Sequence, residues 1–192
     1  LVASWSVTKT RSANVAELEA QLVQNISEKT EKAIQDSVEA IELHIPDRTL
    51  RDIGLVIEAQ RKGLLEQFLS VHEFANVEEV TMISADGHEI EKLRRDGEPA
   101  PLQVDSVSTS TPFIEASKKG RYFSPVVFER GVPIMTLAAQ ILNGKGDMIG
   151  LFITKMKLAF IQDDVLKNVV LGSRGVVVII DQSGKIVGHS GN

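Results

Sequence analysis

One long helical pattern near the N-terminus constrains the fold of this chain more than any other feature. Between residues 15 and 45, apolar side chains recur at steps of three or four, with Thr30 at the one polar step. This spacing places them on one face of an α-helix whose other faces carry Glu, Gln, Lys and Ser. The apolar face consists of Val15, Leu18, Leu22, Ile26, Ile34, Val38, Ile41 and Ile45. We therefore predict an amphipathic helix roughly 45 Å long, ended by Pro46, which cannot donate the next backbone hydrogen bond.

A second helix and a series of strands are predicted to follow. Apolar residues between 49 and 74 indicate a helix that we expect Gly63 to break or bend. From residue 79 onward, apolar runs alternate with Gly- and Asp-containing turns, which is typical of hairpins. The predicted elements are strands 79–83, 88–90, 122–129, 133–142 and 148–157, a loop over 96–112, and a short helix from Phe113 to Lys119 ended by Gly120. Short turns between consecutive strands imply antiparallel pairing, so the fold class is α+β.

The end of the chain repeats the first hairpin. After a predicted connecting helix over 158–171, residues 177–184 (Val-Val-Ile-Ile-Asp-Gln-Ser-Gly) align with residues 80–87 (Val-Thr-Met-Ile-Ser-Ala-Asp-Gly). Both segments are apolar strands that lead to a glycine where a tight turn needs positive φ. The pattern fits the start of a second copy of one module, although any β-hairpin can share it.

Composition and motifs exclude several functions. The formal net charge of −5 is opposite to what nucleic-acid binding requires, so we expect no nucleic-acid partner. The absence of cysteine excludes disulfides, thiolate zinc sites and thiol nucleophiles, and the four histidines lie at no metal-ligand spacing. Neither a Gly-x-Ser-x-Gly motif nor a phosphate-binding loop is present. We therefore predict no catalytic residue, no metal and no cofactor, and expect that the chain is not an enzyme.

The sequence also lacks a membrane-spanning segment. It contains no run of about 18 apolar residues, the length that a span needs. The chain starts at Leu1 rather than Met, which we interpret as an excised fragment next to a removed span. An arbitrary boundary is the alternative. We expect contact with a membrane only through removed transmembrane segments.

The order of these elements resembles a known family of bacterial receptors. A long N-terminal helix precedes a hairpin with Asp-Gly at its turn, the helix and glycine of Phe113 to Gly120, the segment Tyr-Phe-Ser-Pro-Val at 122–126, and the closing run 172–184. In this order, residues 10–192 are similar to the double Cache (PAS-like) sensor domains of histidine kinases, nucleotide and diguanylate cyclases and chemoreceptors. No single motif is specific to that family, and the resemblance depends on the order of all of them.

The resemblance implies a domain plan. Residues 1–46 would form a stalk helix, 47–157 a membrane-distal sensor module around a central antiparallel sheet, and 158–192 a connecting helix with the first hairpin of a truncated membrane-proximal module. It also implies a periplasmic or extracellular position in an inner-membrane receptor. The N-terminal helix would form a homodimer and carry the signal. Whether the full-length protein also carries a kinase or cyclase output domain stays open.

The resemblance also implies a small-molecule ligand between the sheet and a lid over 96–121. One subgroup of the family holds amino acids with an Arg-x-Trp-Tyr run and an Asp on the last meander strand. Here the only Trp is Trp5, and Lys155 aligns with that Asp, so a ligand ammonium group would face a cation. We therefore expect an anionic or carboxylate ligand, held by Lys155 and Arg95.

Tyr122, Ser124 and Met135 complete the predicted ligand site. The alternative for Tyr122 and Met135 is a core position, and Ser124 before Pro125 also suits a strand edge. For Lys155 and Arg95 the alternative is a solvated surface position. The rival of ligand sensing is a structural spacer, or a dimerisation or protein-interaction domain, that binds no small ligand. A polar cavity under the lid would favour sensing, and a filled, dry site would favour the spacer.

Overall fold

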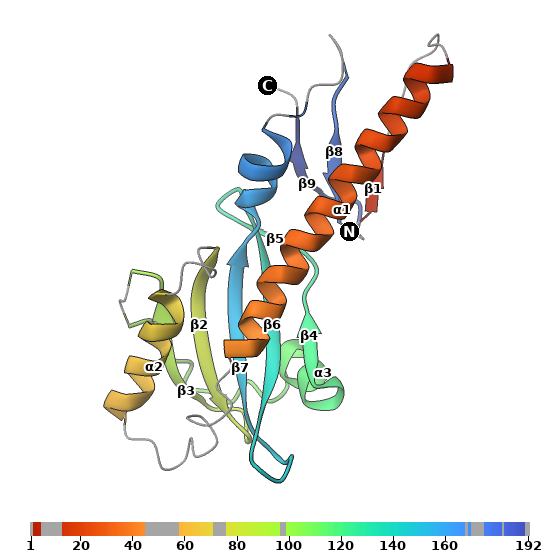
Figure 1. The fold of residues 1–192 in the computed structure, drawn as a ribbon. Helices are drawn as coiled ribbons and strands as arrows, with labels where there is room; N and C mark the ends of the chain where they lie inside the picture. Colours follow the sequence, from red (N-terminus) through yellow and green to blue (C-terminus); the bar gives the residue numbers. More distant parts are fainter. Residues whose placement is uncertain are drawn as a thin grey trace. The chain divides into compact units, whose positions relative to one another are not determined.

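The computed structural model divides the chain into two units, and its elements are labelled in Figure 1. One, the sheet unit, comprises Ser37–Ser124 and Ile134–Lys157. The other, the hairpin unit, comprises Leu1–Asp36, Pro125–Pro133 and Leu158–Asn192. The structure describes residues 2–4, 13–44, 58–70, 76–96, 99–167, 169, 175–181 and 183–190.

Antiparallel strands in the order β3-β2-β7-β6-β4 form the core of the sheet unit, and β5 pairs with β6. Their bounds are β2 (Val77–Ser84), β3 (Glu89–Arg94), β4 (Arg121–Phe123), β5 (Val127–Glu129), β6 (Val132–Leu142) and β7 (Met148–Lys157). The predicted antiparallel α+β fold is confirmed. The single strand predicted over 122–129 is wrong, because it divides between β4 and β5 at Ser124-Pro125, where proline has no N–H for the ladder.

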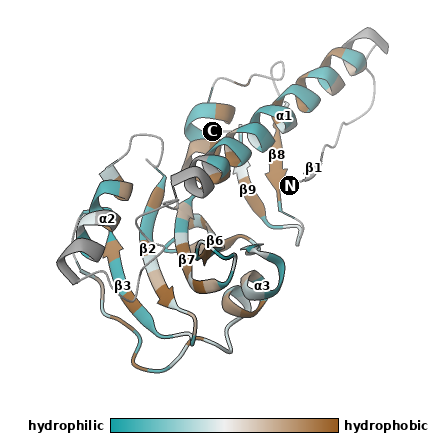
Figure 2. Ribbon diagram, turned by 60° about the horizontal axis from the view of Figure 1, so that its bottom comes forward, coloured by the Kyte–Doolittle hydropathy of each residue, from teal (hydrophilic) through white to brown (hydrophobic). Residues whose placement is uncertain are grey.

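Helix α2 (Glu58–Ser70) packs on one face of this sheet, the α2 face. Its Leu65, Phe68 and Leu69 are buried together with strand residues Val77, Val80, Met82, Leu93, Leu137, Ile141 and Phe152. These strands include runs of consecutive buried residues, and hydrophobic and hydrophilic positions are mixed along them (Figure 2). The predicted break at Gly63 is wrong, because α2 continues through it. A Cβ there would meet nothing within 4 Å, so the glycine costs only its helix propensity of about 1 kcal/mol.

Helix α3 (Thr111–Lys119) packs on the opposite face, the α3 face. Ile83, Ala138 and Leu151 are each the next residue in the chain to a member of the α2-face cluster, so they point to the other side of the sheet. They are buried with Phe113 and Ala116 of α3. The sheet therefore carries two separate apolar clusters, one on each face.

Both ends of α3 are fixed by specific hydrogen bonds. Ser110 caps the N-terminus with its side-chain oxygen, and Gly120 ends the helix with a φ of +85°, as predicted. The Gln140 amide on β6 donates to the carbonyls of Ala116 and Ser117 at 3.2 and 2.9 Å. The bond to Ser117 satisfies a carbonyl near the helix C-terminus, where carbonyls lack partners within the helix, whereas the Ala116 carbonyl also accepts from the Gly120 N–H. Both bonds hold α3 against the sheet.

The loop over 99–110, part of the predicted lid, runs along the β2–β3 hairpin. The backbone N–H of Gln103 donates to Oε2 of Glu89 at 2.7 Å, and that of Val107 donates to the Gly87 carbonyl at 2.8 Å. The φ of Gly87 is +89°, and a Cβ on it would lie 2.7 Å from atoms of the loop. Glycine is therefore required here both by the backbone angle and by the close approach of the loop.

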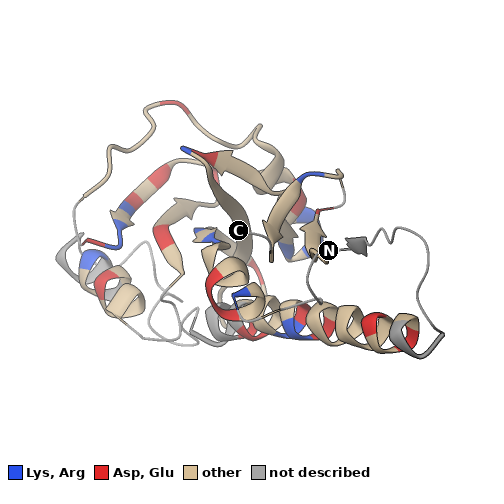
Figure 3. Cartoon of the chain, turned by 90° about the horizontal axis from the view of Figure 1, so that it is seen from above, with Lys and Arg blue, Asp and Glu red and all other residues tan. Residues whose placement is uncertain are grey.

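Helix α1 (Ala13–His44) confirms the predicted long N-terminal helix. Ile26, Thr30 and Val38 on its predicted apolar face are buried, whereas Leu18 is 65% exposed. Charged residues of both signs lie along the helix (Figure 3). Pro46, the predicted stop, lies outside the described residues, as does Ile45.

The hairpin unit contains a sheet of β1 (Val2–Ser4), β8 (Val178–Ile180) and β9 (Ile186–His189), in the order β1-β8-β9. Within the predicted connecting helix, residues 161–166 form a π-helix, η2 (Ile161–Leu166), directly after two α-helical residues. It packs closely on β9, since a Cβ on Gly188 would lie 2.9 Å from Cδ1 of Leu166. Residues 168 and 170–174 lie outside the described part of the chain.

The two turns that the sequence aligns are built alike. In each, the backbone N–H of the first turn residue, Ser84 or Asp181, donates at 2.9 Å to the carbonyl four residues later. Gly87 and Gly184 then adopt φ angles of +89° and +82°. The hydroxyl of Ser183 donates to Oδ1 of Asp181 at 2.7 Å and is the main reason why the pKa of Asp181 lies below its usual value. The shared bonding supports the predicted repeat of one hairpin.

Candidate functional site

A row of polar side chains crosses the α3 face. On β6 and β7 it lies two residues along the strand from Ala138 and Ile153, which belong to the α3-face cluster. In the register of the sheet, Lys155 lies opposite Thr136 on one side and Glu79 on the other, and Glu79 lies opposite Arg94. Directly opposite residues of antiparallel strands point to the same side. We call Thr136, Lys155, Glu79 and Arg94 the polar row.

Two cations flank one carboxylate in the polar row. Oε1 of Glu79 lies 3.7 Å from Nζ of Lys155, and Oε2 lies 4.0 Å from Nε of Arg94. Both distances exceed a normal hydrogen bond, so the contacts are loose ion pairs. The Glu79 side chain is 16% exposed, whereas those of Lys155 and Arg94 are 39% and 52% exposed. The carboxylate therefore lies close to the sheet, and the two cations extend further into solvent.

The next row toward α3 mixes apolar and polar groups. Tyr122 lies opposite Ala138, which lies opposite Ile153, and the row ends at Lys92 of β3. The ammonium group of Lys92 lies 2.8 Å from Oε1 of Glu89, and both side chains are nearly buried. Glu89 also accepts a hydrogen bond from the Gln103 N–H of the lid loop, so Glu89 fastens the lid to β3. Within the described residues, the hydroxyl of Tyr122 has no hydrogen-bond partner.

Three of the predicted ligand residues lie close to this surface. Lys155 is at the centre of the polar row, and Tyr122 is half-buried in the α3-face cluster. Ser124 follows β4, where its backbone N–H donates to the Thr136 carbonyl and its Oγ accepts from the Thr136 N–H, both at 2.9 Å. Ser124 thus extends the ladder past β4, and its hydroxyl oxygen is already engaged.

Met135 and Arg95 lie away from the polar row. Met135 is buried on the α2 face, because it is next to Thr136 in the strand. Arg95 donates from Nε to the Val77 carbonyl at 2.7 Å and from Nη1 to the Leu69 carbonyl at 3.1 Å. Its guanidinium therefore ties the end of α2 to the start of β2, so we omit both residues from the site proposed below.

The sequence prediction did not include Glu79, Thr136 and Arg94. The period of two on each strand already places Glu79 with Thr81, and Thr136 with Ala138, on one face. The missing information was the register that brings these strands together, which depends on long-range pairing. A hairpin register counted from the Asp-Gly turn would have placed Glu79 close to Arg94.

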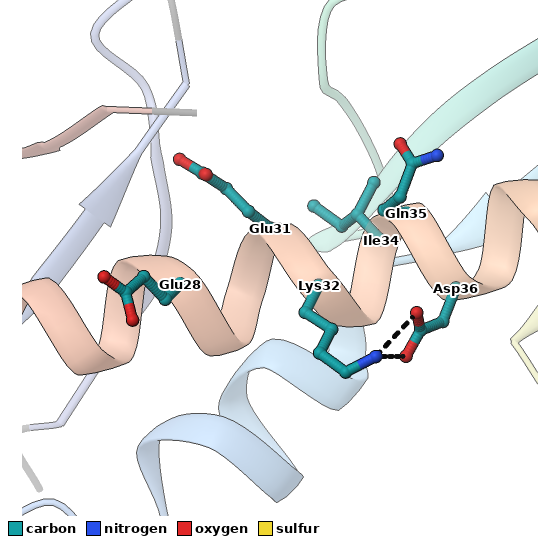
Figure 4. Close-up of a pocket in the computed structure, with 6 residues that line it drawn as sticks. All are labelled: Glu28, Glu31, Lys32, Ile34, Gln35 and Asp36. Carbon is teal, nitrogen blue, oxygen red and sulfur yellow. Dashed lines mark hydrogen bonds and ion pairs between the residues drawn. The ribbon is translucent and has the colours of Figure 1, made fainter.

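A shallow hollow also lies beside α1 (Figure 4). Its lining residues are Glu28, Glu31, Lys32, Ile34, Gln35 and Asp36. Lys32 is paired with Asp36 at 2.8 Å, and Figure 4 shows that the six side chains do not converge on one point. A small-molecule site needs converging polar groups, so this hollow is a poor candidate. Among the described residues, no three His, Asp or Glu side chains gather as a metal site requires.

Comparison with protein families decides what kind of domain carries this surface. The sequence model of the Cache domain family matches residues 7–192. The chain belongs to the Cache domain family. The match confirms the resemblance that the order of elements indicates, and it spans both units of this Cache chain.

Solved sensor domains share the fold at low sequence identity. The extracellular domain of a histidine kinase is 14% identical, with a TM-score of 0.61 over 81% of this chain and 61% of that one. The ligand-binding domain of the Pseudomonas aeruginosa amino-acid chemoreceptor PctC, solved with GABA, is 15% identical, with a TM-score of 0.60 over 91% and 74%. That of a Campylobacter jejuni chemoreceptor, solved with L-norvaline, is 15% identical, with a TM-score of 0.63 over 96% and 74%. The Cache chain thus spans 61% of the histidine-kinase domain.

Family membership sets the general function. Cache domains are extracellular sensor domains of membrane receptors, so ligand sensing in signal transduction is the function of this Cache chain. No curated protein matches the sequence. Among the described residues, no helix has the length and apolar character needed to cross a membrane.

Proposed function

We propose that the Cache chain is the periplasmic or extracellular part of a bacterial inner-membrane receptor of the histidine-kinase or cyclase type, and that its α3 face binds a small molecule through a carboxylate. The observation that carries the proposal is the polar row, in which Lys155 and Arg94 flank Glu79 beside the hydroxyl of Thr136. Carboxylate oxygens only accept hydrogen bonds, and ammonium and guanidinium groups only donate them. The row therefore offers donors of the kind that a carboxylate needs.

Lys155 is the central ligand residue in this proposal. Its neighbours Thr154 and Met156 are buried on the other face, so the strand fixes where the Lys155 side chain leaves the sheet. The half-buried hydroxyl of Tyr122 lies one row nearer α3, where it can donate to a second group of the ligand. The lid loop, fastened by Gln103 and Glu89, would close over the bound molecule.

The ligands of the structural neighbours support the same chemical group. PctC was solved with GABA, and the Campylobacter receptor with L-norvaline. Both molecules contain a carboxylate. Because this chain and the two receptors share little sequence identity, only this shared group of their ligands is used to support the proposal. Lys155 would repel an ammonium group placed where the amino-acid subgroup has its Asp, so binding of amino acids in that mode is not proposed.

The signal and the homodimer are assigned to α1. Because Ile26, Thr30 and Val38 are buried within the chain, a homodimer through α1 would use its exposed polar side, which includes the Lys32–Asp36 ion pair. Ligand binding would then shift the helix between two packings, which is the usual way that a ligand biases a two-state receptor. The domain plan with boundaries at 46 and 157 stays a prediction.

Replacing Lys155 with methionine is expected to weaken carboxylate binding by at least about tenfold, because the charge-assisted hydrogen bond is lost while the length of the side chain is kept. A thermal-shift screen of the fragment against small carboxylates, amino acids, amines, sugars and purines identifies the ligand class, since a ligand of the folded state raises Tm. Calorimetry then compares the two proteins.

Lys145→Met is the matched control, because Lys145 lies in the exposed turn between β6 and β7, away from the polar row. It removes the same charge and should bind like the wild type. Equal affinity in the Lys155→Met protein would contradict the proposed site. If no compound of any class raises Tm, the spacer or protein-interaction function becomes the better account.

A further inference from the structure

The turn between β6 and β7 contains Asn143 followed by Gly144 (Figure 1). An asparagine is attacked most easily by the backbone nitrogen of the next residue when that residue is glycine, which has no Cβ to hinder the approach. We infer that Asn143 is a latent deamidation site, and that its hydrogen bond to Asp147 keeps it unreactive while the chain is folded. The inference does not depend on the identity of the ligand.

Deamidation consumes only water. The Gly144 nitrogen loses its proton and bonds to Cγ of Asn143, the bond between Cγ and Nδ2 breaks, and Nδ2 leaves with that proton as ammonia. Water then opens the resulting succinimide ring at either carbonyl, which gives aspartate or isoaspartate, and no group is oxidised or reduced. The fold can therefore slow the reaction by hindering the approach of the nitrogen to Cγ or by hindering the departure of Nδ2.

Crowding does not protect this pair of residues. Gly144 is exposed, and a Cβ on it would meet nothing within 4 Å. Asn143 is only half-buried, so it is open to water. The chain around Gly144 leaves room for the attack, and any protection has to come from the hydrogen bonds that hold the Asn143 side chain.

Those hydrogen bonds engage both ends of the Asn143 amide. Its Oδ1 accepts from the backbone N–H of Lys145 at 2.8 Å and from that of Asp147 at 2.9 Å. Its Nδ2 donates to Oδ2 of Asp147 at 3.0 Å. The backbone closes around them, because the Asn143 N–H donates to the Asp147 carbonyl at 2.9 Å and the Gly146 N–H donates to the Asn143 carbonyl at 3.0 Å. The turn therefore fixes the amide and its partners together.

The bond from Nδ2 to Asp147 is the protective one. The N–H donors at Oδ1 also stabilise the negative charge that develops on this oxygen during the attack, so they do not by themselves slow the reaction. Nδ2, in contrast, has to gain a proton to leave, and a carboxylate only accepts hydrogen bonds. A hydrogen bond to a charged group is also stronger than one between neutral groups. Asp147 thus holds Nδ2 in place and offers it no proton.

Asp147→Ala tests this role, because it removes the acceptor for Nδ2. The wild type and the variant are incubated at mildly alkaline pH, both folded in buffer and unfolded in urea, and mass spectrometry of the peptide around residue 143 follows the conversion. The folded wild type should deamidate at least about tenfold more slowly than the unfolded chain, as one charge-assisted hydrogen bond predicts. Folded Asp147→Ala should lose most of this protection, and in urea the two proteins should react at equal rates.

Asp105→Ala is the matched control, because it removes the same charge from an exposed position in the lid loop. It should react like the wild type. Asp147→Asn keeps an oxygen acceptor for Nδ2 and should stay within about threefold of the wild type, which separates the lost hydrogen bond from a general loosening of the turn. A wild type that reacts as fast in buffer as in urea overturns the inference, whatever the variants do. Equal rates in folded Asp147→Ala and the wild type, or equal acceleration in Asp105→Ala, also overturn it.

Discussion

Replacing Gly87 with alanine is expected to lower the free energy of unfolding of the sheet unit by about 3 kcal/mol, from a strained φ and an overpacked contact together. The φ of Gly87 is +89°, and its new Cβ would lie 2.7 Å from Ser106 and Ser108. Backbone as well as side-chain atoms of the lid loop lie there, so no rotamer change can relieve the clash. The loop has to move away from the β2–β3 turn, and the Val107 hydrogen bond to Gly87 is lost with it. Urea denaturation measures the loss.

Gly146→Ala separates the two causes. Gly146, in the turn between β6 and β7 of the same unit, also has a φ of +89°, but a Cβ there would meet nothing within 4 Å. Alanine at this position should cost only the backbone strain, about 1 kcal/mol. Equal losses at the two glycines would mean that the lid loop does not press on the hairpin, and its assignment as a fastened lid would be wrong.

Replacing Arg95 with methionine is expected to cost about 2 to 3 kcal/mol of stability and to leave ligand affinity unchanged. The guanidinium donates to the carbonyls of Val77 and Leu69, and part-buried carbonyls left without donors are costly. The end of α2 would separate from β2, so the melting temperature should fall. Thermal denaturation measures the change in stability, and calorimetry with a carboxylate ligand measures the affinity.

Arg94→Met is the natural comparison, because the same substitution at the neighbouring residue should have the opposite effects on stability and on binding. Arg94 is half-exposed and loosely paired, so its loss should change stability by less than about 1 kcal/mol while it weakens carboxylate binding. The reverse pattern, with binding lost in Arg95→Met and stability unchanged, would return Arg95 to the ligand site that the sequence predicts.

Local patterns in the sequence were sufficient for most of the fold. The period of three and four residues gave α1, the Asp-Gly turn gave the β2–β3 hairpin, and Gly120 gave the end of α3. Each of these depends on residues close together in the chain. The order of such local signals was also enough to indicate the Cache family, which the match over residues 7–192 confirms.

The errors came where long-range contacts decide the outcome. Gly63 stays helical because α2 is held by Leu65, Phe68 and Leu69 against the sheet, which outweighs the weak helix propensity of one glycine. For Arg95, the sequence predicted a role in binding an anionic ligand, which stays a prediction; in the structure its guanidinium donates to backbone carbonyls that lie far from it in the chain.

The candidate site was only partly predictable for the same reason. Lys155 was predicted from the family alignment and Tyr122 from strand alternation, and both lie on the α3 face. Glu79 and Arg94 lie on β2 and β3, which precede Lys155 and Tyr122 by many residues in the chain. Only the register of β2 between β3 and β7 brings these charges together.

The central claim is that this Cache domain senses a carboxylate at the polar row of the α3 face. A crystal structure of the domain with the tightest carboxylate from the screen tests it most directly. The account predicts that the ligand carboxylate lies within hydrogen-bonding distance of Nζ of Lys155, with the lid loop closed over it. A ligand bound in the hairpin unit or along α1, with the polar row unchanged, would contradict the account.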